Sequence, residues 1–201
     1  EAVEAVREAG GLYIADEVQP GYGRSGRHMW GFQCHGLVPD IVTLGKPMGN
    51  GHPTAGITVK PQILERFANE SGYFNTFAGN PVSSAVGLAV LEVIERENLI
   101  ANAHESGKFM LDGLKHLAAR HPVIGDVRGM GLYLGVDFTT PEGAPDAATA
   151  AQVVNGLREE HVLIGAAGPH ANTLKIRPPL VFQREHAEIF LNSLERVLER
   201  L

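Results

Sequence analysis

The sequence predicts a mixed α/β fold followed by a smaller α+β layer. In roughly the first 80 residues, short apolar runs alternate with glycine-rich loops and helical segments, an order typical of α/β sheets. The later residues predict two long helices, a pair of strands around glycines, and then helix, strand and helix. We therefore expect two parts, residues 1–90 and residues 91–201, with the boundary inside or just after a helix that starts at Asn80.

The first part opens with the helical stretch "EAVEAVREAGG", which Gly10 and Gly11 end. Apolar runs predict short strands at residues 12–15, 40–45 and 54–59, and the first of these is expected to be buried. Pro61 lies at a favoured first-turn position and starts a further helix. An aromatic and glycine-containing loop, "YFNTFAGNP", comes next.

The helix expected from Asn80 has the clearest pattern in the chain. Asn80 is a good N-cap, and apolar residues recur at spacings of 3 and 1: Val82, Ala85, Val86, Ala89, Val90, Val93 and Ile94. A second helix is expected from about residue 102 to residue 120, and strands on both sides of Gly129–Gly131. Two further helices are expected to bury Ala147, Ala150, Val154 and Leu157, and Ala187, Phe190, Leu194, Val197 and Leu201. The strand between them is stopped by Pro178 and Pro179.

Composition narrows the function classes. The net charge is −6 and the 17 Lys and Arg residues are scattered, so no basic patch indicates nucleic acid or an anionic membrane. No apolar run reaches the length of about 18 residues that a membrane span needs. The single cysteine, Cys34, excludes an internal disulfide and suggests a reducing, cytoplasmic location, with Cys34 as a small buried hydrophobic residue. The abrupt helical start suggests a fragment.

The stretch "LYIADEVQPGYGRSG" carries two adjacent carboxylates, Asp16 and Glu17, directly after an apolar run. A dinucleotide site is one interpretation, because Gly21, Gly23 and Gly26 fit the G-x-G-x-x-G pattern and Asp40 lies near the spacing of a ribose-binding acid. The context is unfavourable, since four residues separate the strand from the glycines and no long amphipathic helix follows.

A metal site is the second interpretation, with Asp16, Glu17 and one of the nine histidines as ligands. The sequence has no H-E-x-x-H, no paired cysteines and no D-x-D-x-D-G loop. This hypothesis therefore has no motif to support it.

The third interpretation pairs Asp16 with a protonated ring nitrogen of a cofactor. A carboxylate against a pyridine nitrogen makes the ring of pyridoxal phosphate an electron sink, and such a cofactor also needs a lysine for its Schiff base. The stretch "DIVTLGKPMGNG" supplies Lys46 directly after an apolar strand.

The sequence resembles the class III aminotransferases, pyridoxal-phosphate enzymes of fold type I. The resemblance rests on "ADEVQPGYGRSG", "PDIVTLGKPMGNGHP", "YFNTFAGNP" and "VRGMGLYLGVDF", in this order, and covers essentially the whole chain. It implies the C-terminal half of such an enzyme: residues 1–90 would be the remainder of the large cofactor-binding domain, and residues 91–201 the small α+β domain.

The resemblance also implies roles for single residues. Asp16 would pair with the pyridine nitrogen, and Lys46 would form the Schiff base and act as general base and acid. Val18 would lie against the ring, Gln19 near its phenolic oxygen, and Thr76 on the cofactor phosphate across the interface of a homodimer. The small-molecule substrates would be an amine or ω-amino acid and a keto acid.

Within the family, the motifs are most similar to the branch of alanine–glyoxylate-type enzymes and phospho-lyases acting on phosphorylated amines. Many class III transaminases have R-x-x-P-P before the last helix, where the arginine binds the substrate carboxylate. Here Lys175 takes that place, in "KIRPP", and Arg177 lies on the same strand face. A phospho-lyase that uses Lys175 or Arg177 for an anionic group is therefore the alternative, and a partial domain that only dimerises is another.

Overall fold

The computed structural model describes residues 1–201, which form two compact units. The first unit contains residues 1–23 and 28–98, and the second contains residues 24–27 and 99–201. The boundary predicted after residue 90 falls inside helix α3 (Pro81–Arg96), and the division into a large and a small domain stays a prediction about the longer protein. None of the helices combines the length and the apolar character that a membrane span requires.

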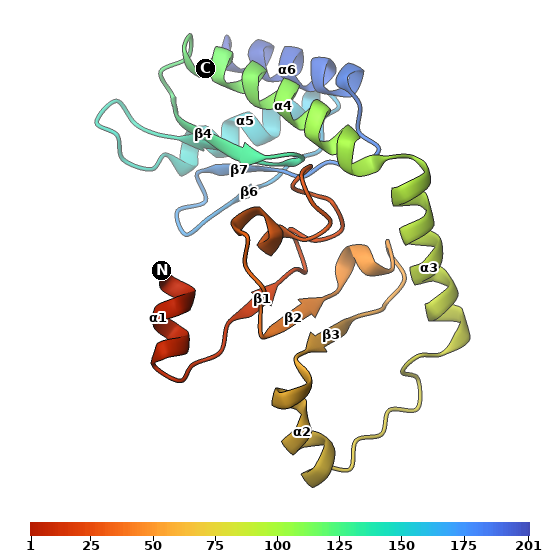
Figure 1. The fold of residues 1–201 in the computed structure, drawn as a ribbon. Helices are drawn as coiled ribbons and strands as arrows, with labels where there is room; N and C mark the ends of the chain where they lie inside the picture. The colour runs from red at the N-terminus through yellow and green to blue at the C-terminus, as the bar shows by residue number, and fades with distance from the viewer. The chain divides into compact units, whose positions relative to one another are not determined.

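The first unit is built around a three-stranded sheet (Figure 1). Strands β1 (Ile14–Asp16) and β2 (Ile41–Leu44) are parallel, and β3 (Gly56–Val59) is antiparallel to β2. The other elements of this unit are α1 (Ala2–Glu8), α2 (Pro61–Glu70), α3, and the short 3₁₀ helices η1 (Gly31–His35) and η2 (Lys46–Met48). The ends of all three strands lie within two residues of the predicted ends.

The first strand is less buried than the sequence predicts. Only Ala15 of β1 is buried, whereas Leu12 and Ile14 are 51% and 54% exposed. Ile14 pairs with Ile41 and lies on the sheet face that also carries the exposed Ile57. An apolar run predicts a strand but not whether both of its faces are covered, and here one face is open.

Helix α3 begins where its cap predicts. The Asn80 side chain accepts a hydrogen bond from the Ser83 N–H, and Pro81 occupies the first turn. The predicted apolar stripe is present along the helix, but Ile94 is its only buried residue. Its surface therefore stays largely accessible within this chain.

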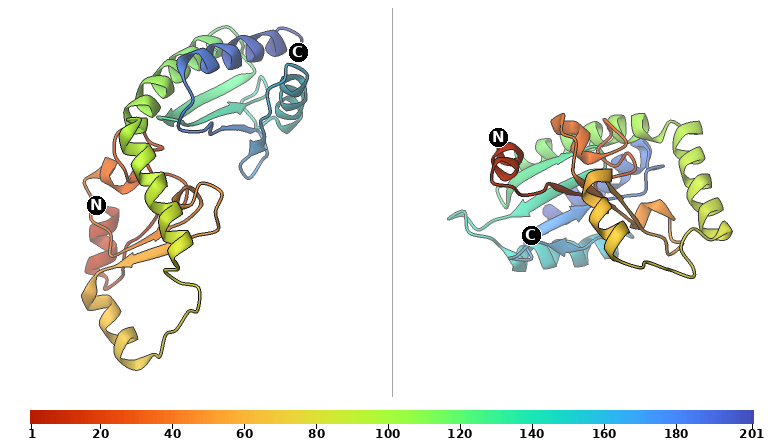
Figure 2. Two further views of the ribbon diagram at one scale, coloured as in Figure 1. Left: turned by 90° about the vertical axis from the view of Figure 1, so that its right-hand side faces the viewer. Right: turned by 60° about the horizontal axis from the view of Figure 1, so that its bottom comes forward.

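The second unit is a sheet covered by helices on one face. Its strand order is β4-β5-β7-β6, all antiparallel: β4 (Ile124–Met130), β5 (Tyr133–Phe138), β7 (Thr173–Ile176) and β6 (Ala166–Ala167). The helices are α4 (Leu99–Ala118), α5 (Ala147–Glu159) and α6 (Arg184–Leu198). Figure 2 shows α4 and α6 side by side on the sheet.

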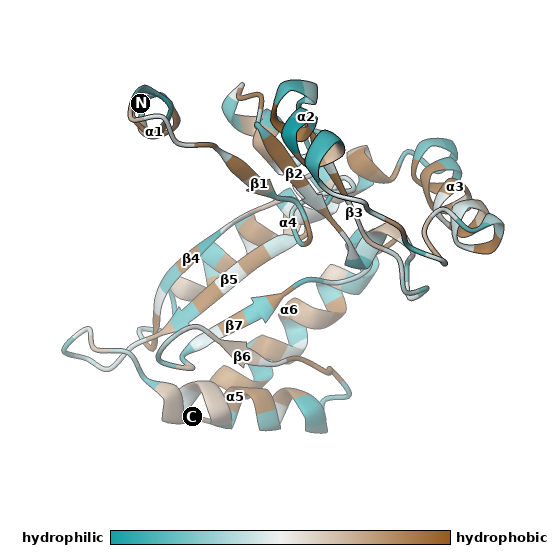
Figure 3. Ribbon diagram, turned by 90° about the horizontal axis from the view of Figure 1, so that it is seen from below, coloured by the Kyte–Doolittle hydropathy of each residue, from teal (hydrophilic) through white to brown (hydrophobic).

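Alternation along the strands separates the core from the open face. Leu134, Val136 and Phe138 of β5 are buried with residues of all three helices, whereas Tyr133 is exposed on the opposite side. Figure 3 shows this alternation of polar and apolar residues along the strands in front of α4 and α6. The hydrophobic core of the chain lies here.

Several packing details differ from the sequence-based expectations. Ala187, Phe190, Leu194 and Val197 are buried as predicted, but Leu201 is 51% exposed because α6 ends at Leu198. In α5 the buried residues are Ala150, Val153 and Leu157, whereas Ala147, the first residue of the helix, is exposed. Cys34 is half-buried rather than buried.

Candidate functional site

The carboxyl ends of β1 and β2 bring the two principal candidate residues to one edge of the first sheet. Asp16 is the last residue of β1 and is paired in register with Thr43 of β2. Lys46 follows the end of β2 by two residues. Since the strands are parallel, both side chains belong to the same end of the sheet, where open α/β sheets bind ligands.

One oxygen of Asp16 is fixed by the protein and the other is not. Its Oδ1 accepts a hydrogen bond from the Thr43 hydroxyl at 3.2 Å and from the Val18 N–H at 3.0 Å. Its Oδ2 makes no hydrogen bond within the described chain, and the residue is exposed. The carboxylate is thus oriented by two donors while an acceptor remains for a further cationic N–H group.

Lys46 has an unusual backbone and an uncommitted side chain. Its φ is 36°, in the left-handed region that non-glycine residues adopt at some energetic cost. Its ammonium group makes no ion pair or hydrogen bond with any residue of the described chain, and the side chain is exposed. A lysine held in a strained turn without a carboxylate partner is suited to reaction with a ligand rather than to structural support.

Val18 lies near the backbone of both candidates. A Cβ built on Gly45 would be 3.7 Å from a methyl group of Val18 and 3.8 Å from Ala55, so Val18 lies over the residue that precedes Lys46. Val18 and Gln19 are both half-buried. They begin a run of turns over residues 18–25 instead of the long helix that a dinucleotide site would need.

Helix α3 supports the loop that carries Lys46. The His52 ring nitrogen Nε2 is 2.8 Å from the Ser83 hydroxyl, which also accepts from the Asn80 amide at 2.9 Å. A Cβ built on Gly87 would lie 3.8 Å from the carbonyl oxygen of Met48. The first turns of α3 therefore contact both ends of the loop after Lys46.

Thr76 is not part of this cluster within the chain. It lies in the extended loop between α2 and α3 (Figure 1), is exposed, and makes no hydrogen bond. Asn75 shapes the loop by accepting from the backbone N–H groups of Phe77 and Ala78 at 3.1 and 3.2 Å. The aromatic residues on either side of Asn75 and Thr76, Phe74 and Phe77, are 85% and 79% exposed.

Lys175 and Arg177 belong to the second unit. They flank the buried Ile176 on β7 and its extension, and both line a cavity of about 580 Å³ with His161 and His186. Lys175 also borders a cavity of about 630 Å³ on the open face of the sheet. Lys175 and Arg177 are predicted to lie on one face of the strand, and the burial of Leu174 and Ile176 on its other face is consistent with this.

Arg24 is a residue whose role the sequence did not indicate. Its Nη1 donates to the Leu132 carbonyl at 3.1 Å and to the Pro178 carbonyl at 2.6 Å. Burial, and then the nearby charge of Arg177, lower the pKa of Arg24. These partners are 108 and 154 residues away, so no local pattern could have identified them.

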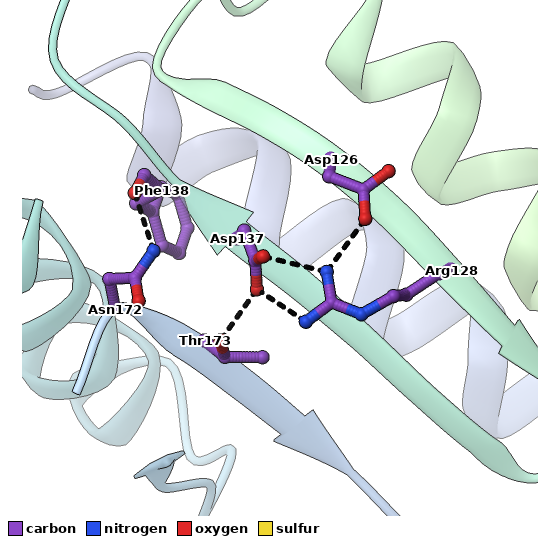
Figure 4. Close-up of polar contacts among 6 residues, drawn as sticks. All are labelled: Asp126, Arg128, Asp137, Phe138, Asn172 and Thr173. Atoms are coloured by element: carbon purple, nitrogen blue, oxygen red, sulfur yellow. Dashed lines mark hydrogen bonds and ion pairs between the residues drawn. The ribbon is translucent and has the colours of Figure 1, made fainter. Parts of the chain in front are cut away.

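A polar network crosses the open face of the second sheet (Figure 4). Arg128 of β4 donates to Asp126 at 2.6 Å and to both oxygens of Asp137 at 2.7 and 3.0 Å, and Thr173 of β7 donates to Asp137 at 2.5 Å. Burial alone would raise the pKa of Asp137, but the hydrogen bonds from Arg128 and Thr173 outweigh this effect and lower the pKa below its usual value. The bond from Thr173 joins β7 to this network, two residues before Lys175 in the strand.

The remaining sequence candidates have structural roles. Asp40 precedes β2 and forms ion pairs with Arg7 at 3.1 Å and Lys60 at 2.7 Å, so its carboxylate is not available to a ribose. Glu17 is 2% exposed and accepts from the N–H groups of Gly31 and Phe32. No group of three His, Cys, Asp or Glu residues in the chain is placed to hold a metal ion.

Comparison with known proteins gives one consistent family. The model of the family "Aminotransferase class-III" matches residues 1–198. An "Alanine--glyoxylate aminotransferase 2-like" protein of Drosophila melanogaster is 45% identical over 199 residues, which are 97% of this chain and 40% of the relative. An "Ethanolamine-phosphate phospho-lyase homolog 1" of Caenorhabditis elegans is 41% identical over 198 residues, which are 96% of this chain and 42% of the relative.

A solved structure is similar over nearly the whole chain. It is a phospholyase from Arthrobacter in complex with phosphoethanolamine, with a TM-score of 0.96 and 48% identity. The similarity covers 99% of this chain and 48% of the other. This chain therefore spans less than half the length of the proteins that it matches.

Proposed function

We propose, from the premise that this chain belongs to the class III aminotransferase family and has its fold, that the full-length protein is a pyridoxal-phosphate-dependent aminotransferase. It would move an amino group from an amine or ω-amino acid to a keto acid. The observation that carries the proposal is the joint position of Asp16 and Lys46 at the ends of two parallel strands. The family and its transaminase members support the cofactor.

The residues at the strand ends fit this cofactor chemically. Asp16 offers a carboxylate oxygen, Oδ2, that no protein donor occupies, and its other oxygen is held by Thr43 and Val18. Lys46 offers an amine without a competing carboxylate. Val18 provides an apolar side chain near the residue before Lys46, and Gln19 follows it in the chain. When bound, the cofactor supplies an electron sink for the charge left at the substrate carbon.

The chain's own residues have distinct tasks in this proposal. Asp16 would hold the proton on the ring nitrogen, because a nearby carboxylate favours the charged form of a cationic partner. Lys46 would hold the cofactor covalently, and its Nζ, once released, would take a proton from the substrate carbon and return one as general base and acid. Val18 would offer its apolar side chain to the cofactor ring.

An absorption experiment on the full-length protein tests the assignment. We expect a visible band on addition of pyridoxal phosphate that is lost in Lys46→Ala and kept in Lys108→Ala, a matched control on the exposed surface of α4. Asp16→Asn should retain the band but lose most of the activity. Absence of any Lys46-dependent band in the wild-type protein would show that the catalytic proposal is wrong and favour the dimerising domain.

A phospho-lyase is the second candidate, and one observation favours it. Lys175 replaces the arginine that many class III transaminases use for a carboxylate, and a lysine provides no bidentate fork. Two of the similar proteins carry phospho-lyase or phospholyase in their names. Release of inorganic phosphate from phosphoethanolamine without a keto acid would identify this reaction. Amino transfer that needs a keto acid would identify the aminotransferase.

The site also has an intermolecular component in this proposal. We expect a cytoplasmic homodimer in which Thr76 binds the cofactor phosphate of the partner subunit. The exposure of Thr76 and of the aromatic side chains around it is consistent with such an interface. Sedimentation of the full-length protein measures its oligomeric state. The Thr76→Ala variant is expected to bind pyridoxal phosphate more weakly than the wild type.

A further inference from the structure

Glu17 is a buried carboxyl group whose side chain is held by backbone N–H groups alone. It is 2% exposed, and it forms no ion pair with any Lys, Arg or His of the described chain. Its Oε2 accepts from the Gly31 N–H at 2.7 Å and its Oε1 from the Phe32 N–H at 2.8 Å. Burial of a polar side chain is costly unless hydrogen bonds replace its contacts with water, so these two bonds account for the burial of Glu17.

The backbone of Glu17 is fixed as completely as its side chain. Its N–H donates to the Thr43 carbonyl at 3.0 Å, and its carbonyl accepts from the Gly21 N–H at 3.1 Å. A Cβ at Gly21 would lie 2.6 Å from the Glu17 carbonyl oxygen, and a Cβ at Gly31 would lie 2.8 Å from Pro20. Only glycine fits either position, so the segment is closed tightly around Glu17.

These contacts enclose the residues expected to meet the cofactor. Asp16 precedes Glu17, and Val18 and Gln19 follow it, inside the segment that Glu17 ties to residues 31 and 32. Glu17 directly follows β1 and is buried, whereas Asp16 is exposed, so the two carboxyl groups have different surroundings. The Val18 N–H that orients the Asp16 carboxylate thus belongs to the peptide unit of Glu17 itself.

We propose that Glu17 is a positioning residue: its buried carboxylate holds residues 31 and 32 beneath the end of β1 and thereby fixes Asp16 and Val18 for cofactor binding. The inference rests on the proposed function. It requires a carboxylate, since both oxygens accept. The amide of Glu17→Gln has a single acceptor oxygen and would turn an NH₂ group toward a backbone N–H.

The matched control is Asp40, the other buried carboxylate of the first unit. It is 7% exposed and accepts from Arg7, Lys60 and the Tyr13 N–H, before β2 begins and thus at the opposite end of the strands. Glu17→Gln and Asp40→Asn both replace a buried carboxyl group of the first unit by an amide. If Glu17 had only a structural role, Glu17→Gln and Asp40→Asn would have equal effects on cofactor affinity and on the pH midpoint of the visible band.

The test uses the full-length protein with and without pyridoxal phosphate. We expect Glu17→Gln to weaken cofactor binding about tenfold, to move the pH midpoint of the visible band, and to speed amide exchange at Gly31 and Phe32 in the cofactor-free protein. Asp40→Asn should lower the melting temperature and leave cofactor affinity and the pH midpoint as in the wild type.

Three results would overturn the inference. They are cofactor affinity within about twofold of the wild type in Glu17→Gln, equal effects of Asp40→Asn on affinity and midpoint, and failure of Glu17→Gln to fold while Asp40→Asn folds. A wild-type protein that forms no Lys46-dependent band would instead refute the proposed function, so the two failures are distinguishable.

Discussion

The two units of the chain are stabilised in different ways. The second unit has a continuous core of apolar side chains from three helices and three strands, including Phe138, Leu157 and Leu194, each 0% exposed. In the first unit the buried apolar residues are few, and Glu17 and Asp40 are buried polar anchors. The unit that carries Asp16 and Lys46 thus depends on specific hydrogen bonds, and the other depends on apolar burial.

The largest expected effect tests that contrast directly. Phe138→Ala in the core of the second unit should lower the free energy of unfolding by about 3–5 kcal/mol, because it removes a fully buried ring. Ile57→Ala in the first unit should change it by less than about 0.5 kcal/mol, since Ile57 is 66% exposed. Urea unfolding followed by circular dichroism measures both, and equal effects would contradict the comparison.

A smaller effect is expected from the polar anchor of the second unit. Arg24→Ala removes both bonds to the Leu132 and Pro178 carbonyls and should cost about 2 kcal/mol. Arg66→Ala is the control, because Arg66 forms only an exposed pair with Glu70 worth about 0.3–0.5 kcal/mol. Faster amide exchange at Leu132 in Arg24→Ala alone checks the assignment, and unchanged exchange there would refute it.

Helix caps allow a matched comparison between the units. Asn80 caps α3 and Asp146 caps α5 by the same bond to the third helical N–H, each worth about 1 kcal/mol. Loss of the cap should fray α3 further than α5, because α3 buries one side chain and α5 buries three. Amide exchange in Asn80→Ala and Asp146→Ala measures this, with the Ser variants as controls that retain a cap.

The smallest effect near neutral pH concerns Asp40. Hydrogen bonds from Lys60, the Tyr13 N–H and Arg7 hold the pKa of Asp40 far below its usual range. Its stabilisation is therefore complete above the unfolded value of about 4 and is lost as the pH falls from there toward the folded pKa. Amide exchange in β1–β3 between pH 5 and pH 2 should accelerate more in the wild type than in Asp40→Asn. Parallel curves would contradict this.

Local sequence signals predicted the elements well and their burial less well. Asn80 and the glycines around residue 130 placed α3 and the β4–β5 hairpin, because caps and turns are specified by neighbouring residues. The two-residue strand β6 has no pattern of its own and was missed. Leu12 and Ile14 look like core residues in sequence, and only the structure shows their open face.

The candidate site divides in the same way. Asp16 and Lys46 could be chosen from the sequence because each follows an apolar strand, and the parallel pairing places them at one edge. Their roles stay predictions, as do those of Val18, Gln19 and Thr76. The contacts of Arg24 could not be predicted, because its partners are distant in sequence and because every residue type has the backbone carbonyl that accepts these bonds.

The surroundings of Trp30 give the protein a built-in optical reporter. Trp30 is the only tryptophan; its ring meets Tyr22 edge-on at 5.1 Å, and a Cβ at Gly21 would lie 3.2 Å from it. It directly precedes Gly31, the residue that Glu17 binds. Intrinsic fluorescence of the unlabelled chain therefore reports on that single segment. A ligand that absorbs in the range of indole emission would quench it by energy transfer.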